Sequence, residues 1–114
     1  MNRGLILGIC CCLWASSARA EQGITASDVR RWCSMVTENS APNFESGYCL
    51  GFMRGILDGI HFTDLDKCVP RGTSPVQAAQ IYKKYATEHP EGLRKAYADL
   101  AAEALRSSFP CSAK

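Results

Sequence analysis

The chain has 114 residues, of which 46% are hydrophobic, 21% charged and 9% aromatic. This composition is typical of one small globular domain, because a disordered chain would be less apolar and two ordinary domains would need more residues. The 13 basic and 11 acidic residues leave a formal charge of +2. A nucleic-acid-binding protein, which must neutralise many phosphates, is therefore disfavoured.

The first twenty residues have the pattern of a secretory signal peptide. Residues 1–3 form a short basic start, and the apolar run 4–14 is too short to span a bilayer. Ala18 and Ala20 supply the small side chains that a signal peptidase recognises, so we expect cleavage after Ala20. Without this segment, residues 21–114 carry eleven basic and eleven acidic side chains and form a neutral, single helical domain.

The first helix is expected to start at Thr25. Thr25 can cap it, Asp28 completes a capping box, and Ile24 can pack against Val29. Its buried stripe is expected to contain Val29, Trp32, Cys33 and Val36, which recur at helical spacing. The polar segment 38–45 is expected to form a loop.

The second helix is expected from about Gly47 to Phe62. Its apolar arc consists of Cys49, Phe52, Met53, Ile56, Leu57 and Ile60. On another side lie four glycines at intervals of four residues, namely Gly47, Gly51, Gly55 and Gly59. Since glycine inside a helix costs about 1 kcal/mol relative to alanine, we expect this strip to pack closely against another helix, inside the fold or across a dimer. Close approach of a ligand is the alternative. Arg54, Asp58 and the short apolar run argue against a membrane helix.

The segment 61–73 contains Pro70 and Gly72 and is expected to form a loop. The third helix has a strong start, because Ser74 can cap it, Pro75 suits its first position and Gln77 completes a capping box. Its inner face is expected to contain Val76, Ala79, Tyr82, Tyr85 and Ala86.

Pro90 is expected to end the third helix and to open the fourth. The apolar residues of this last helix are Leu93, Ala96, Tyr97, Leu100, Ala101, Ala104 and Leu105, which recur at helical spacing. Pro110 ends it. With four helical patterns and no strand pattern, the sequence predicts an all-α fold, a small up-and-down bundle of four helices.

The expected mature chain retains four cysteines, Cys33, Cys49, Cys68 and Cys111. An even number in a small exported domain favours two disulfides. Cys49 and Cys68 lie near opposite ends of the second helix, about 20 Å apart, whereas a disulfide needs Cα atoms about 4.4–6.8 Å apart. In an up-and-down bundle the remaining geometry predicts the pairs Cys33–Cys49 and Cys68–Cys111.

No residue pattern indicates catalysis. His61 follows the second helix and His89 lies at a helix junction, neither beside a free cysteine, and Ser74 is explained as a cap. No two cysteines form a CxxC pair, and Asp64 and Asp66 alone do not make a calcium site. We therefore expect no catalytic residue, cofactor or metal.

Four stretches of the chain carry a family resemblance: residues 49–59, 68–75, 85–93 and 102–111. In these stretches the chain resembles the Rap/Tai immunity family, small periplasmic proteins that protect bacteria from peptidoglycan amidases delivered by type VI secretion. The resemblance spans nearly the whole expected mature domain. It implies a periplasmic, non-catalytic inhibitor, often a homodimer, that binds an amidase effector and blocks its active-site cleft.

The candidate contacts with such an effector are residues that the core pattern does not require, namely Phe62, Asp64, Arg71, Lys83, Lys84 and Glu88. Two other functions remain open for a similar helical fold. One is a small periplasmic stress chaperone, and the other is an adaptor module of an envelope complex.

Overall fold

The structure is a computed structural model that describes residues 23–36 and 41–111. It contains the helices α1 (Ala26–Cys33), α2 (Phe44–Gly59), α3 (Pro75–Glu88) and α4 (Tyr97–Ser108), with the 3-10 turns η1 (Ile60–Phe62), η2 (Asp64–Lys67) and η3 (Pro90–Arg94). The described residues contain no strand. The predicted signal peptide, its cleavage site after Ala20 and part of the predicted loop lie outside these residues. No helix in the described ranges combines the length and the apolar character needed to cross a bilayer.

Two helix starts are capped as the sequence predicts. The Thr25 hydroxyl accepts a hydrogen bond from the Asp28 backbone N–H at 3.1 Å, and the Asp28 carboxylate accepts one from the Thr25 N–H at 3.0 Å. The Thr25 N–H and the Thr25 hydroxyl both donate to the Asp28 carboxylate, and these two bonds lower the pKa of Asp28 below its ordinary value. Ser74 and Gln77 form the same reciprocal pair at the start of α3.

The second helix begins three residues earlier than predicted, at Phe44 rather than Gly47. Asn43 caps it, because its side-chain oxygen accepts a hydrogen bond from the Ser46 N–H at 2.8 Å. The Ser46 hydroxyl in turn accepts one from the Asn43 N–H at 3.3 Å. The α-helix also ends earlier, at Gly59, and continues as the 3-10 turn η1. The predicted loop therefore ends at Asn43.

The last helix begins later than predicted. Residues 90–94 form the separate turn η3, and Lys95 adopts an extended backbone with φ −78° and ψ 164° before α4 starts at Tyr97. The turn packs tightly, since a Cβ atom added to Gly92 would lie 2.7 Å from Leu100 Cδ1. Leu93 and Ala96 consequently precede α4.

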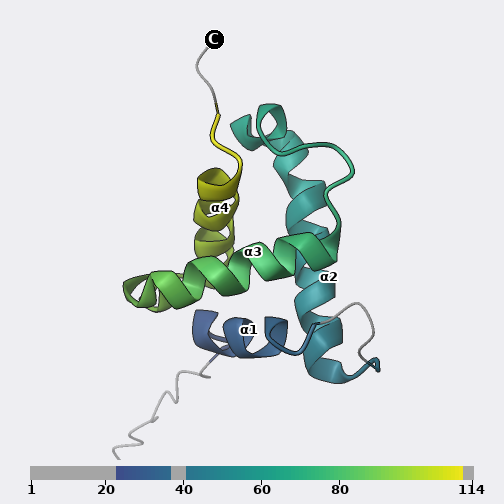
Figure 1. The fold of residues 1–114 in the computed structure, drawn as a ribbon, viewed down its shortest axis with the longest axis vertical. Helices are drawn as coiled ribbons and strands as arrows, with labels where there is room; N and C mark the ends of the chain where they lie inside the picture. The colour runs from purple at the N-terminus through teal and green to yellow at the C-terminus, as the bar shows by residue number, and fades with distance from the viewer. Residues whose placement is uncertain (1–22, 37–40, 112–114) are drawn as a thin grey trace, which may run out of the picture.

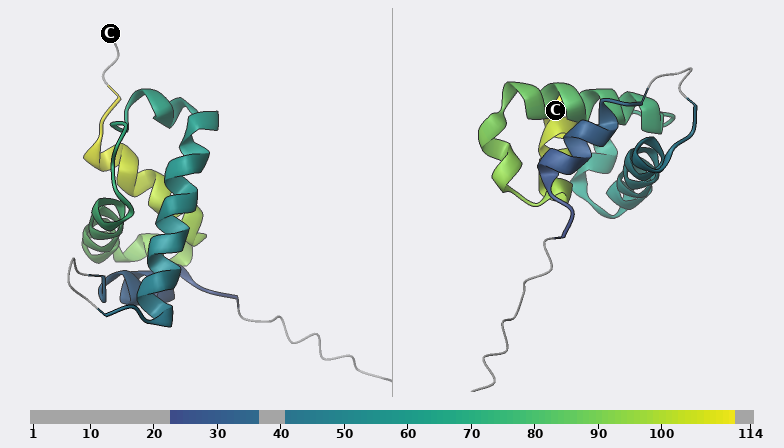
Figure 2. Two further views of the ribbon diagram at one scale, coloured as in Figure 1. Left: turned by 90° about the vertical axis from the view of Figure 1, so that its right-hand side faces the viewer. Right: turned by 90° about the horizontal axis from the view of Figure 1, so that it is seen from below.

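The predicted all-α bundle is confirmed, but its helices cross steeply instead of running up and down a common axis. In Figure 1, α1 and α3 are roughly horizontal, whereas α2 and α4 are roughly vertical. The two views of Figure 2 show the same crossing. The short helix α1 packs against α2, α3 and α4.

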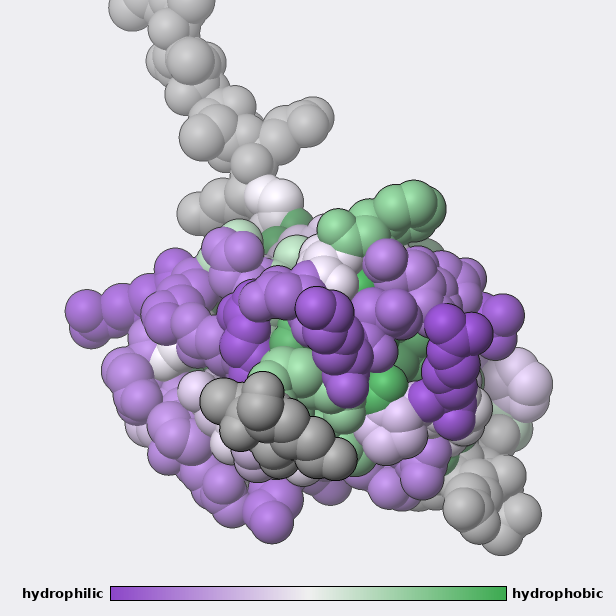
Figure 3. Space-filling view, turned by 90° about the horizontal axis from the view of Figure 1, so that it is seen from above, coloured by the Kyte–Doolittle hydropathy of each residue, from purple (hydrophilic) through white to green (hydrophobic). Residues whose placement is uncertain are grey.

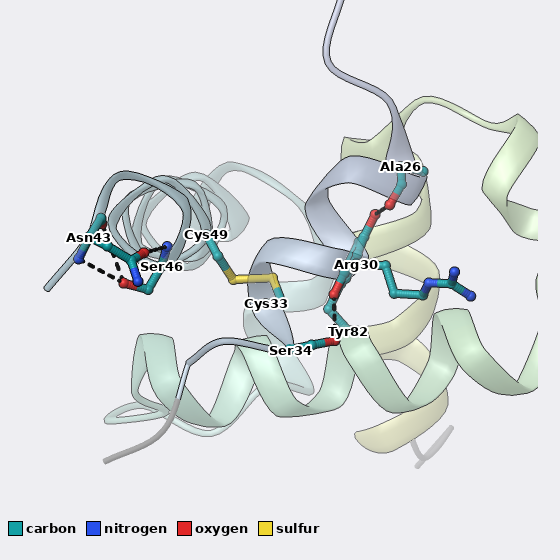
Figure 4. Close-up of a disulfide and its surroundings, with 8 residues drawn as sticks. All are labelled: Ala26, Arg30, Cys33, Ser34, Asn43, Ser46, Cys49 and Tyr82. Carbon is teal, nitrogen blue, oxygen red and sulfur yellow. Dashed lines mark hydrogen bonds between the residues drawn. A yellow bond between two sulfur atoms is a disulfide. The ribbon is translucent and has the colours of Figure 1, made fainter. Parts of the chain in front are cut away.

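Tyr82 lies at the centre of this arrangement. Its side chain is fully buried, and its hydroxyl donates a hydrogen bond to the Ala26 carbonyl at 3.2 Å (Figure 4). Burial raises the pKa of Tyr82 strongly. This hydrogen bond links the middle of α3 to the first turn of α1.

The two disulfides are the pairs predicted from the sequence. Cys33–Cys49 is buried and joins α1 to α2, with Cα atoms 5.3 Å apart (Figure 4). Cys68–Cys111 joins the residue after η2 to the segment after α4, with Cα atoms 4.9 Å apart. In the chain-entropy model, closing loops of 16 and 43 residues stabilises the fold by about 3 and about 4 kcal/mol.

Candidate partner-binding site

The six candidate contact residues are all exposed, but they form two separate groups. Phe62, Asp64 and Arg71 belong to the turns η1 and η2 and to the loop that follows them. In Figure 1 these turns lie at the upper end of α2, whereas the second half of α3 extends away from α2. The structure thus does not unite the six residues in one patch.

Phe62 is the most exposed large hydrophobic side chain among the described residues, with 92% of its surface accessible. The turn that carries it is nevertheless anchored, because its neighbours Ile60 and Leu65 are buried. The Thr63 hydroxyl donates to the Ile60 carbonyl at 2.8 Å and accepts a hydrogen bond from the Leu65 N–H at 3.2 Å. A large apolar side chain therefore projects into solvent from a well-packed turn.

Beside this turn lies a cavity of about 280 Å³, which we call the Arg71 cavity. It is enclosed by the second half of α2, the two turns and residues 69–73. Its hydrophobic lining comes from Leu57, Ile60 and Val69, and its charged or titratable lining from Arg54, Asp58, His61, Asp66 and Arg71. Viewed from this end of the molecule, hydrophobic residues are visible between surrounding hydrophilic ones (Figure 3).

Two ion pairs occupy part of that lining. Arg54 Nε lies 3.2 Å from an Asp58 carboxylate oxygen, and His61 Nδ1 lies 2.6 Å from an Asp66 carboxylate oxygen. The sequence did not indicate the His61–Asp66 contact, which forms because η1 and η2 fold back on each other. No serine, threonine or cysteine side chain in the described residues forms a hydrogen bond with His61, and these residues contain no cluster able to hold a metal ion.

The second group of candidate contacts, Lys83, Lys84 and Glu88, lies on α3. All three side chains line a shallow hollow of about 350 Å³, together with Thr87. Lys84 and Glu88 also border a smaller hollow of about 210 Å³ between α3 and α4. This surface is open, and it carries no projecting aromatic side chain.

The glycine strip of α2 is not a helix contact inside the described fold, which corrects that part of the prediction. A Cβ atom added to Gly47, Gly51, Gly55 or Gly59 would have nothing within 4 Å. The opposite face of α2 carries the buried residues Cys49, Met53 and Leu57. Packing of the strip against a second chain, or close approach of a ligand to it, stays a prediction.

An aromatic cluster at the start of α2 was missed from the sequence. Trp32 packs edge-on against Phe44 and Tyr48, with ring centroids 6.0 and 4.9 Å apart. Phe44 remains 71% exposed. The Tyr48 and Tyr97 hydroxyls lie 3.3 Å apart, and this hydrogen bond raises the pKa of Tyr48. The sequence prediction placed Phe44 in a loop, whereas it is the first residue of α2 and therefore lies one helical turn before Tyr48.

The chain matches the model of a known protein family. The family model of the Rap1a immunity proteins matches residues 25–111, which is most of the chain. No curated protein and no solved structure matches. The matched range begins at the Thr25 cap and ends at Cys111, so it includes all four helices and both disulfides.

Proposed function

Because the chain belongs to the Rap1a immunity protein family, we propose that it binds and blocks a peptidoglycan amidase delivered by type VI secretion. The family match over residues 25–111 is the observation that carries this proposal, since it indicates an immunity protein against a secreted effector. The proposal also specifies an amidase as the target and the periplasm as the location. They are supported by the sequence resemblance and by the signal-peptide pattern of residues 1–20.

The proposed mechanism is inhibition by binding, without catalysis. The two disulfides hold α1 against α2, and the segment after η2 against the end of α4. A surface that is already ordered loses little conformational entropy on docking, which favours tight binding. Such a protein acts in a fixed ratio to its effector rather than by turnover.

Of the two groups of candidate contacts, we propose the turns η1 and η2 as the part that enters the effector cleft. Phe62 projects from an anchored turn, and aromatic side chains, phenylalanine included, are enriched in the cores of protein interfaces. Asp64 follows Phe62 by two residues, and Arg71 lines the cavity beside this turn. The α3 group, Lys83, Lys84 and Glu88, is the second contact region of the proposal.

Co-expression with a candidate amidase tests this function. The probe is a small secreted Cys/His hydrolase encoded beside the gene of this chain, exported to the periplasm of a host cell, where it degrades the wall. The full chain should restore growth, and a chain lacking residues 2–20 should not, because it stays in the cytoplasm. Growth that is not restored by the full chain would contradict the proposal for that amidase.

A homodimer is also part of the proposal, as the family resemblance implies. Sedimentation of the mature chain across a range of concentrations tests it independently of any effector. A species of twice the monomer mass at micromolar concentration would support the dimer, and a monomer throughout would refute it.

A further inference from the structure

We propose that the Arg71 cavity is a carboxylate-binding site that accepts an acidic side chain of the effector, with Arg71 as the recognition group. The inference rests on the proposed function, in which this end of the molecule meets the effector. It goes further because it assigns a site, a ligand chemistry and a recognition residue.

The charges of the lining favour an anion. Both carboxylates that line the cavity already have a nitrogen partner, since Asp58 pairs with Arg54 and Asp66 with His61. Arg71 has no acidic partner within salt-bridge distance in the described part of the chain. Its guanidinium therefore retains its donors for a ligand from outside.

The chemistry of arginine specifies the ligand class. A guanidinium presents several N–H donors in a planar fork that matches the two oxygens of a carboxylate. The backbone N–H groups of Arg71 and Gly72 add two donors, because neither donates to any described residue. A neutral acceptor would form weaker hydrogen bonds with these donors than a carboxylate, and a cationic group would be repelled by the guanidinium.

The loop that carries Arg71 is held by hydrogen bonds of its own. The Thr73 N–H and the Thr73 hydroxyl both donate to the Pro70 carbonyl, at 3.2 and 2.7 Å. Gly72 has φ +89°, the left-handed conformation that a type II turn requires at its third residue. Val69 is buried next to this turn.

The surroundings of the cavity define the shape of the partner. Leu57, Ile60 and Val69 give part of the lining an apolar character, which excludes some water and strengthens an ion pair formed there. Phe62 projects next to His61, which lines the cavity. The fitting effector surface has an acidic side chain beside an apolar recess that receives Phe62.

The site can be tested without any effector, by using acetate as the probe and acetamide as its neutral control. Titrating acetate into the isotope-labelled mature chain at constant ionic strength should shift the NMR signals of the Arg71, Gly72 and Thr73 amides. The shifts should saturate with an affinity on the order of 10–100 mM, because a single ion pair at an accessible site is weak. Acetamide should leave these signals unchanged.

Arg71→Gln should abolish the acetate shifts while the rest of the spectrum shows an intact fold. Arg106→Gln, which removes an exposed arginine of α4 outside this cavity, is the matched control and should titrate like the unaltered chain. Absence of saturable shifts at the loop, or equal shifts in Arg71→Gln, would overturn the carboxylate site.

The second arm uses the candidate amidase. Arg71→Gln should weaken its binding at least about tenfold, and Arg106→Gln should not. Equal binding by Arg71→Gln and the unaltered chain would overturn the docking role of the cavity while leaving the immunity function standing. If the unaltered chain does not bind the amidase, the proposed function fails for that amidase, and the acetate titration still decides whether the site exists.

Discussion

The exposed glycine strip of α2 gives a quantitative prediction about stability. Substituting Gly51 and Gly55 by alanine adds two methyl groups that meet no atom within 4 Å, so no steric cost opposes the change. Alanine is favoured over glycine in a helix interior by about 0.5–1 kcal/mol at each site. The double variant should therefore be more stable than the natural chain by about 1–2 kcal/mol. For a domain of this size, that corresponds to a rise in melting temperature of roughly 5–15 °C.

Thermal and urea unfolding, followed by circular dichroism at 222 nm and low micromolar concentration, measures this effect. Gly92→Ala is the matched control, because its added methyl group would lie 2.7 Å from the fully buried Leu100 side chain. Overpacking of this kind destabilises a fold by about 1–3 kcal/mol. Glycine-to-alanine substitution should therefore raise the stability at Gly51 and Gly55 and lower it at Gly92.

Destabilisation of the Gly51→Ala and Gly55→Ala double variant in dilute solution would refute this reasoning, because it would mean that the strip packs against the chain itself. If the stability gain in dilute solution turns into a loss at high concentration, a second chain covers the strip. That result would connect the glycines to the proposed homodimer.

Three further predictions concern the core, the first helix cap and the exposed disulfide. Tyr82→Phe should cost about 1 kcal/mol in urea unfolding, the usual contribution of one hydrogen bond, because it removes the donor to the Ala26 carbonyl. The pKa of Asp28 is lowered in the folded state, so the ionised carboxylate stabilises the fold at pH values above its ordinary pKa near 4. This stabilisation is lost as the pH falls below that value and the group becomes protonated. Asp28→Asn should therefore make the free energy of unfolding less dependent on pH below about 4. Mild reductant should open the disulfide at the exposed Cys111 before the buried one, as alkylation and mass spectrometry would reveal; the reverse order would contradict the burial pattern.

The elements that were predicted well are those with a local signal. Thr25 with Asp28, and Ser74 with Gln77, are reciprocal caps between residues three apart, so the sequence contains the whole interaction. The start of α2 was missed because Asn43 and Ser46 form the same kind of cap with an unusual residue pair. The break before α4 was missed because it depends on Gly92 packing against Leu100, a contact of the folded chain.

The site was less predictable than the fold. The helical period shows on which side of α2 the glycines lie, but not whether anything covers that side. The crossing angles of the helices depend on how their side chains pack together, so the sequence suggested an up-and-down bundle instead. Phe62 was identified as a surface residue because the core pattern does not use it. Its anchored turn and the cavity beside it depend on the folding of η1 against η2.

The most direct test of inhibition by binding is a titration of amidase activity. Peptidoglycan hydrolysis by the candidate amidase is measured while the purified mature chain is added in known molar ratios. If the chain inhibits by binding, activity should fall in proportion to the added chain and vanish at a fixed ratio, with the chain recovered intact. Undiminished hydrolysis at a large molar excess, or complete inhibition by a small fraction of one chain per amidase, would contradict inhibition by binding.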